Sequence, residues 1–173
     1  MEQVYYFIIM GALLFEYSLS TISAILNMNS ITERVPEEFK EYYNLEKYAK
    51  SQSYLKDKTR FGLFSGTFSL LLMLIVIHTG IFGILDTFIK SYSNNSILSG
   101  LMFFGILFFI NDIINLPFSI YSTFVIEEKY GFNKTTINTF ISDKIKGYGL
   151  FIVLGSVVIV PVLYFFETYE TNG

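Results

Sequence analysis

Two acidic residues stand alone in apolar sequence, and they are the first candidates for chemistry. Glu16 is the only charged residue within Gln3–Thr32, and Asp112 is the only one within Ile97–Ile126. A pair of carboxyl groups can act as a general acid and a general base when the protein holds them in a fixed geometry. Nothing in the sequence fixes that geometry, so it assigns no catalytic residue.

Polar side chains accompany both carboxylates at helical spacing, which gives each stretch one polar face. The residues on these two faces are Glu16, Ser20, Ser23 and Asn27, and Asn111, Asp112, Asn115, Ser119 and Ser122. Such residues commonly join membrane helices by hydrogen bonds. Alternatively, they line a water-filled cavity with the two carboxylates on its wall. A third stretch carries Gly62, Gly66 and Ser69, small residues that suit close helix approach.

Metal and thiol chemistry are limited by composition. The chain has no cysteine and one histidine, His78, so it offers no disulfide, thiolate nucleophile or two-histidine zinc motif. We therefore expect no metal or cofactor on this chain and a structural, hydrogen-bonded role for His78. The net charge of −3 gives no indication of nucleic-acid binding.

The helices that position these residues are predicted from the stretches of sequence that contain few or no charged residues. The chain is 52% apolar and 16% charged, against roughly 45–50% and 25% in soluble domains. Because ~20 helical residues cross the ~30 Å hydrocarbon core, we predict an all-α membrane protein with amphipathic loop helices. The four predicted transmembrane helices span about residues 3–32, 61–85, 97–126 and 147–166, with a kink at Pro117 in the third.

Orientation follows from the basic residues of the connecting segments. The loop at residues 33–60 carries seven Lys or Arg, the loop at 127–146 carries four, and Asp86–Ser96 carries only Lys90. Positive charge favours the cytoplasmic side. We therefore predict a multi-pass protein of the lipid bilayer with both long loops in the cytoplasm and both termini on the opposite side.

Both long loops are predicted to contain helices that lie on the membrane surface. In the first, aromatic and apolar residues recur among charges, and in the second, one apolar face follows a capping threonine, Thr135 or Thr136. These sets are Phe39, Tyr42, Tyr43, Leu45 and Tyr48, and Ile137, Phe140, Ile141 and Ile145. Lys144 and Lys146 fall on the other face, toward anionic lipid. Glu127 and Glu128 follow the third helix, where a solvated helix end is the simplest interpretation.

Two segments resemble one known family. The run Leu116–Lys134 (LPFSIYSTFVIEEKYGFNK) is similar to the segment after the third membrane helix of type I CAAX prenyl proteases, which are integral-membrane zinc metalloendopeptidases. The first loop resembles the same family at Val35–Phe39 (VPEEF) and at a second set of residues. That set is Lys50, Ser51, Tyr54, Asp57, Lys58 and Phe61. Tyr130 stands where many members have histidine.

The resemblance implies that residues 1–173 are a single N-terminal membrane domain around part of an intramembrane chamber. It implies a zinc site on the cytoplasmic side, formed by an H-E-x-x-H motif that this sequence lacks. The chain would then be inactive alone and would work with a zinc-bearing catalytic half, in the same polypeptide or a separate one, on peptide substrates that are prenylated or otherwise membrane-associated. Five residues are candidates for contact with the chamber or with that half: Glu16, Asp112, Asn115, Glu127 and Glu128.

Two other classes remain open. One is a non-catalytic membrane protein that binds lipid or peptide or serves as a scaffold, which suits a chain with its own Met1 and a short acidic tail. The other is a small transporter, which gives no role to the long aromatic loops.

Overall fold

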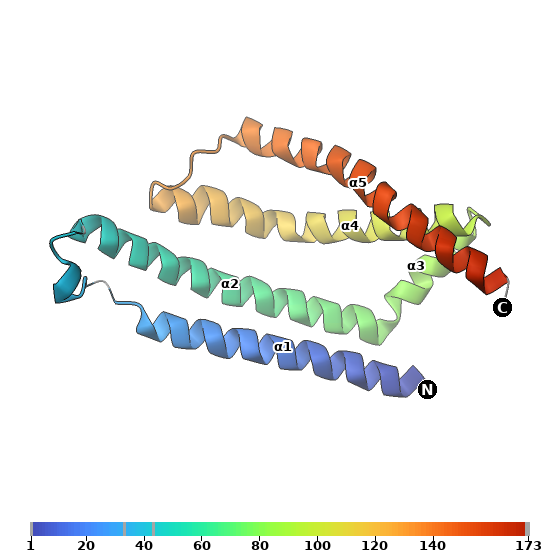
Figure 1. The fold of residues 1–173 in the computed structure, drawn as a ribbon, viewed down its shortest axis with the longest axis horizontal. Helices are drawn as coiled ribbons and strands as arrows, with labels where there is room; N and C mark the ends of the chain where they lie inside the picture. The colour runs from blue at the N-terminus through green and yellow to red at the C-terminus, as the bar shows by residue number, and fades with distance from the viewer. Residues whose placement is uncertain (1, 33, 43, 172–173) are drawn as a thin grey trace. The chain divides into compact units, whose positions relative to one another are not determined.

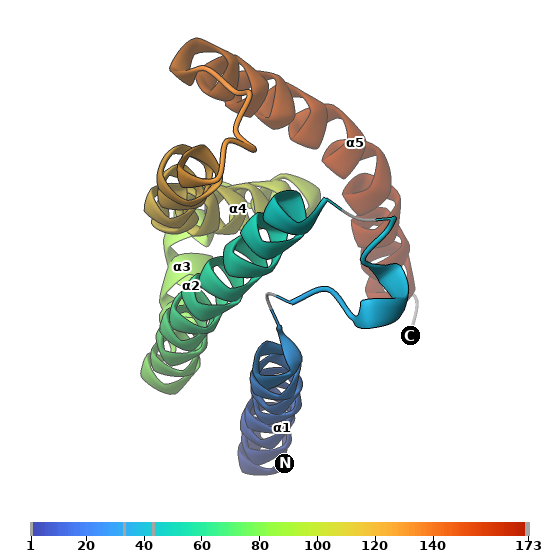
Figure 2. The ribbon, with the colours of Figure 1, turned by 90° about the vertical axis from the view of Figure 1, so that its left-hand side faces the viewer.

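The computed structural model describes residues 2–32, 34–42 and 44–171, and every regular element in these ranges is helical (Figure 1). The long helices are α1 (Glu2–Ser30), α2 (Leu45–Thr79), α4 (Ser96–Tyr121) and α5 (Ile137–Thr171), and α3 (Ile81–Lys90) is shorter. The 3-10 helix η1 (Glu37–Phe39) lies in the connection between α1 and α2 (Figure 2), and the π-helix η2 (Ser122–Glu127) continues α4. The predicted all-α class is confirmed.

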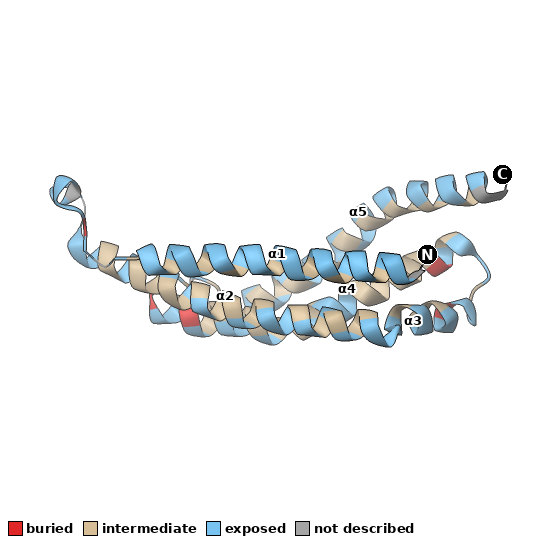
Figure 3. Cartoon of the chain, turned by 90° about the horizontal axis from the view of Figure 1, so that it is seen from below, coloured by how far each residue is buried: buried red, intermediate tan, exposed pale blue. Residues whose placement is uncertain are grey.

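The apolar surface of the helices matches lipid as the solvent. Among the described residues, four segments are long and apolar enough to cross a membrane: Gln3–Ser30, Leu45–Thr79, Ser96–Glu127 and Ile137–Tyr169. Most of their side chains are exposed or half-buried (Figure 3), and the buried apolar residues of the described chain are Val35, Ile89, Ile126 and Tyr130. So much exposed apolar surface is unfavourable in water but not in lipid, which is itself apolar. A helix is also suited to lipid because its backbone N–H and C=O groups bond to one another within the helix. These segments bear out the four predicted transmembrane helices.

The second long helix differs from the predicted 61–85 at both ends. It begins at Leu45, because Asn44 Oδ1 accepts a backbone hydrogen bond at 3.0 Å from the first turn and caps the helix. It ends at Thr79, because Gly80 adopts the left-handed backbone with φ 70°. The prediction of a separate surface helix in the first loop is therefore wrong from Leu45 onward. Its Tyr43 lies outside the described residues.

The predicted loop at 127–146 is also shorter than expected. Helical backbone continues through η2 to Lys129, and a turn with Gly131 at φ 64° follows. The helix α5 begins at Ile137, where Thr136 Oγ1 accepts a backbone hydrogen bond at 3.2 Å. The expected cap is present, but the helix after it is the start of the fourth membrane-spanning helix and not a separate surface helix.

The chain forms two compact units. Unit 1 contains Met1–His78 and Phe118–Asn133, and unit 2 contains Thr79–Pro117 and Lys134–Gly173. Within α4, the border between the units falls after Pro117, which lacks a backbone donor.

In unit 1, aromatic rings join α2 to the segment that follows Pro117. The ring centroids of Phe61 and Tyr121 are 4.8 Å apart, and those of Phe68 and Phe118 are 5.1 Å apart. Such pairs add to the free energy of simple area burial. On the other side of α2, the Tyr6 hydroxyl lies 3.1 Å from His78 Nδ1, so the single histidine is hydrogen-bonded to α1.

In unit 2, stacked rings join α4 to α5. Phe108 and Phe151 stack with their centroids 3.6 Å apart and their planes 6° from parallel. Phe109 meets Tyr148 edge-on at 5.1 Å. Ile89, at the end of α3, is 1% exposed and is the most deeply buried side chain described.

Replacing Gly80 by alanine should destabilise the fold, because a side chain at φ 70° is strained although a Cβ there meets no atom within 4 Å. The expected loss is about 1–2 kcal/mol of unfolding free energy. Gly83, inside α3, is the matched control: its Cβ also meets nothing within 4 Å, so Gly83→Ala should leave stability unchanged or raise it by up to ~1 kcal/mol. Thermal unfolding in detergent micelles measures both. Equal effects at the two positions would contradict the left-handed break.

Candidate functional site

The carboxylate of Asp57 connects α2 to the turn that follows η2. Its Oδ2 atom lies 2.7 Å from the Lys129 ammonium and accepts a hydrogen bond of 2.6 Å from the Tyr130 hydroxyl. Tyr130 is 8% exposed, so its ring packs while its hydroxyl keeps a polar partner. Together these contacts fix the residues after η2 against the charged end of α2.

A second set of contacts lies one residue further along α2. Lys58 Nζ lies 3.3 Å from Glu127 Oε1 and donates a 2.7 Å hydrogen bond to the Tyr54 hydroxyl. The Tyr54 ring meets Phe132 edge-on, with the centroids 4.8 Å apart. The Glu127 carboxylate is therefore engaged inside unit 1.

Glu128 is placed differently from Glu127. It is exposed, and one carboxylate oxygen accepts a 3.0 Å hydrogen bond from the Asn133 side-chain amide. The turn beneath it is closed by hydrogen bonds to the Glu128 and Glu127 carbonyls from the N–H groups of Gly131 and Phe132, both 2.9 Å. Because π-helical segments such as η2 often occur at functional sites, this exposed carboxylate is the better contact candidate of the two.

The Asp57 carboxylate also stabilises the protonated forms of its two partners. Its hydrogen bond raises the pKa of the Lys129 ammonium above the usual value. The same hydrogen bond, with burial, raises the pKa of the Tyr130 hydroxyl. Both groups therefore keep their protons at neutral pH. A raised folded-state pKa stabilises the fold below the ordinary value, so this contribution falls only as the pH rises beyond about 10.

In unit 2, Asp112 forms an ion pair with Lys144 and accepts a 2.7 Å hydrogen bond from the Tyr148 hydroxyl. The two charged side chains are only 18% and 27% exposed. The expectation that Lys144 faces anionic lipid is therefore wrong: the ammonium finds a carboxylate on α4. Asn115, one turn further, donates hydrogen bonds to Asn111 of the same helix, at 2.7 Å to its backbone oxygen and 3.1 Å to its side-chain oxygen.

Glu16 lies in unit 1 on α1, midway between Glu2 and Ser30. It lines an open groove of about 480 Å³ between α1 and α2. An ionised carboxylate at the centre of a membrane helix costs about 2.5–3.5 kcal/mol on insertion scales. The residues that the structure describes give this carboxylate no hydrogen bond or ion pair. Glu16 and Asp112 belong to different units.

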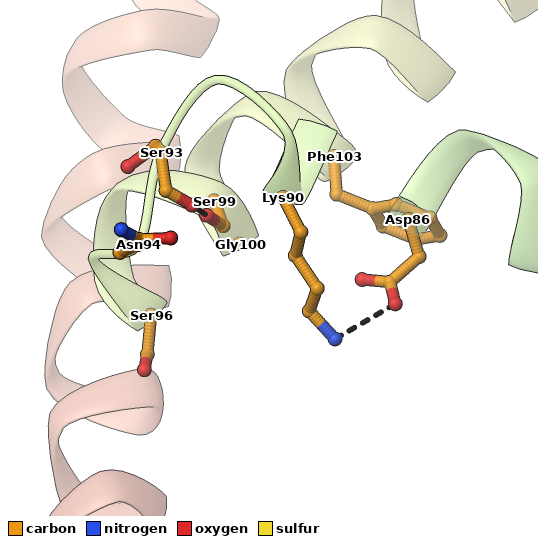
Figure 4. A pocket seen from close by; sticks show the side chains of 8 residues that line it. All are labelled: Asp86, Lys90, Ser93, Asn94, Ser96, Ser99, Gly100 and Phe103. Carbon is orange, nitrogen blue, oxygen red and sulfur yellow. Dashed lines mark hydrogen bonds and ion pairs between the residues drawn. The ribbon is translucent and has the colours of Figure 1, made fainter. Parts of the chain in front are cut away.

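A further pocket of about 570 Å³ lies beside the connection of α3 and α4 (Figure 4). Its two charged residues, Asp86 and Lys90, form an exposed ion pair of 2.8 Å within α3. Ser99 donates a 3.0 Å hydrogen bond to the Ser93 carbonyl. These polar groups are therefore paired with one another by an ion pair and a hydrogen bond. Such pairing is typical of the polar end of a membrane helix.

Among the described residues, no three His, Asp or Glu side chains come together in a way that could hold a metal ion.

The contacts of Tyr54, Asp57 and Lys58 were not predicted, because their partners lie about 70 residues away in the sequence. One indication was available: both segments resembled the same family. In the structure, these two segments contact each other through the Asp57 and Lys58 contacts and the ring of Phe61.

Comparison with known proteins identifies one family. The model of a family described as CAAX prenyl protease N-terminal, five membrane helices, matches residues 8–173. A probable CAAX prenyl protease 1 of Schizosaccharomyces pombe is 36% identical over 143 residues, which are 75% of this chain and 30% of that protein. The CAAX prenyl protease 1 of Saccharomyces cerevisiae is 26% identical over 176 residues, 95% of this chain and 39% of that protein.

A solved structure matches the fold over nearly the whole of this chain. The crystal structure of S. mikatae Ste24p aligns with a TM-score of 0.84 and 27% identity, covering 96% of this chain and 40% of that one. The chain therefore spans well under half the length of these relatives. The family description counts five membrane helices, whereas the described residues form four of sufficient length. The ten residues of α3 extend about 15 Å, half of the hydrocarbon core.

Asp112→Leu should cost about 2–3 kcal/mol of unfolding free energy, because it leaves the Lys144 ammonium half-buried without its partner. Asp86→Leu breaks a pair whose side chains are 47% and 65% exposed and should cost less than about 0.5 kcal/mol. Combining Asp112→Leu with Lys144→Met should restore most of the loss. Thermal unfolding in one detergent compares the three variants. Similar losses for both aspartates would show that the Asp112 pair is not shielded from solvent in the folded chain.

Proposed function

Because this chain belongs to the CAAX prenyl protease N-terminal family, we propose that it is the membrane half of a zinc metalloendopeptidase. In this proposal it forms part of an intramembrane chamber that receives prenylated or other membrane-associated peptides. The zinc ion and its H-E-x-x-H ligands belong to a catalytic half outside residues 1–173, in the same polypeptide or a separate one. The chain alone then has no peptidase activity.

One observation carries this proposal: the two segments that resemble the family form a single contact surface. Asp57 and Lys58 of the first segment pair with Lys129 and Glu127 of the second. A surface fixed by ion pairs between distant segments, with an exposed carboxylate at Glu128, suits a rigid docking site for another domain. We assign the contact with the catalytic half to Glu128.

The remaining candidates are assigned by the environment of each side chain. Glu16 lines a groove and lacks a partner among the described residues, so it faces the chamber or the catalytic half. Asp112 and Asn115 hold hydrogen bonds within unit 2, and we propose that they shape the chamber wall. Glu127 positions the turn that presents Glu128.

The orientation proposed from loop charges has structural support. The charged end of α2 and the turn after η2 meet through the Asp57 and Lys58 contacts, so within unit 1 the end of the first basic loop and the start of the second, at residues 127–133, lie together. Eleven of the twelve basic residues occur in these loop regions. We propose that this end is cytoplasmic, which puts both termini on the opposite side.

Purification of the tagged chain from its native membranes should recover a protein segment that carries H-E-x-x-H. The complex should cleave a prenylated peptide, and a zinc chelator should abolish the cleavage, whereas the purified 173-residue chain should show none. Glu128→Ala should lower recovery of the partner by about tenfold, which corresponds to the loss of a charged contact. The exposed Glu38 provides the control variant Glu38→Ala. Chelator-sensitive cleavage by the chain alone would sink the proposal, and so would recovery of lipid without a peptidase partner.

The absence of cysteine allows the orientation to be tested with single thiols. In spheroplasts, a membrane-impermeant thiol reagent should label Asn94→Cys at once, because Asn94 is exposed between α3 and α4. It should label Glu41→Cys, in the first basic loop, only after permeabilisation. The reverse pattern would invert the proposed topology.

A further inference from the structure

The groove between α1 and α2 lies at the depth where an unpaired charge is least tolerated. Glu16 is at the middle of a 29-residue helix, so the hydrocarbon core surrounds it even if the helix shifts along its axis by a few residues. The structure describes no partner for its carboxylate. A charge in this position needs either an opposite charge or a water-filled space.

A hydrogen bond joins the two helices beside the groove. Thr67 Oγ1 donates to the Leu63 carbonyl at 2.7 Å, which uses its only hydrogen, so the Tyr17 hydroxyl donates to Thr67 across a distance of 2.5 Å. This bond fixes α1 against α2 with Glu16 and Tyr17 both lining the groove. The carboxylate is therefore presented to the groove by a defined helix pair.

Two of the α2 residues that line the groove are glycines. Gly62 and Gly66 are spaced as G-x-x-x-G, a pattern that lets another helix approach closely. A Cβ at Gly62 would meet no atom within 4 Å, and one at Gly66 would meet only the Tyr17 ring, at 4.0 Å. Within the described chain, this glycine surface is thus unoccupied although it lines the same groove as Glu16.

The relatives contain the length of chain needed to fill such a groove. This chain covers 30% of the S. pombe protein and 40% of the Ste24p structure. We propose that a further membrane-spanning helix of the protease, outside residues 1–173, docks in the α1–α2 groove. Its backbone lies against Gly62 and Gly66, and a lysine or arginine near its centre pairs with Glu16. This inference rests on the proposed function and adds the chemistry of the partner helix.

A designed helix tests the inference without the native partner. The probe is a Leu- and Ala-rich transmembrane peptide with one central lysine and one cysteine a turn away, reconstituted with the full chain in phosphatidylcholine vesicles. Ser20 lines the groove and Ser18 does not, although both are exposed at nearly the same depth of α1. With copper phenanthroline and dissolved oxygen added as the oxidant, disulfide formation with the probe should be about tenfold faster for Ser20→Cys than for Ser18→Cys.

Further variants of the chain and of the probe test whether the cross-linking depends on Glu16, on Gly62 and on the probe's lysine. Added to the Ser20→Cys chain, Glu16→Leu and Gly62→Val should each remove this preference, and so should a probe with leucine in place of lysine. Gly11→Val is the matched control, because Gly11 has an equally open Cβ position but does not line the groove. It should leave the cross-linking rate unchanged.

Three results would overturn the inference. The first is equal cross-linking at the two serine positions, or cross-linking that ignores Glu16→Leu. The second is rapid reaction of Ser20→Cys with a hydrophilic thiol reagent that the probe does not slow, which would indicate a water-filled cavity. The third is efficient pairing of two Ser20→Cys chains, which would identify a second copy as the occupant. Recovery of the zinc-bearing partner together with any of these would leave the proposed function standing while the groove assignment falls.

Discussion

The Asp57 carboxylate is the contact on which the position of the family-like segment depends. One oxygen receives both the Lys129 ammonium and the Tyr130 hydroxyl, from residues more than 70 positions away. An exposed ion pair alone contributes little, but this one is combined with a buried tyrosine ring and a second pair between Lys58 and Glu127. The two sets are linked, because the ring of Tyr54, whose hydroxyl accepts a hydrogen bond from Lys58, meets the Tyr130 ring with the centroids 5.7 Å apart. Together they fix the segment after η2 as a unit.

Lipid explains why such polar clusters, and not a buried apolar core, determine the fold. Apolar helix surfaces gain little from meeting one another when the surrounding solvent is equally apolar. Specific ring contacts, such as Phe108 on Phe151, and hydrogen bonds, such as Tyr17 to Thr67, must therefore supply the preference of one helix for another. This is consistent with the small number of buried residues in the described chain.

The sequence predicted the helix class and four long apolar segments, because charge-free length reports directly on membrane crossing. It did not predict where α2 and α5 begin, because charged residues before the apolar part were interpreted as loops. Asn44 caps the start of α2 and Thr136 caps the start of α5. Of these two residues, only Thr136 was among the capping residues predicted from the sequence. The break at Gly80 was hidden inside a charge-free stretch. The pairing of Asp112 with Lys144 could not be inferred, since it depends on how α5 packs on α4.

Glu16 and Asp112 look alike in the sequence, and their environments separate them. Asp112 has its cation within the chain, which makes it part of the packing of α4 on α5. Glu16 has no such partner among the described residues. A charge in lipid is costly, and this one has no opposite charge in its own domain. It therefore indicates either an unfinished interface, whose opposite charge lies on another segment, or a water-filled space. Since this chain matches well under half of each relative compared, we infer an unfinished interface, with the missing charge on a segment outside residues 1–173.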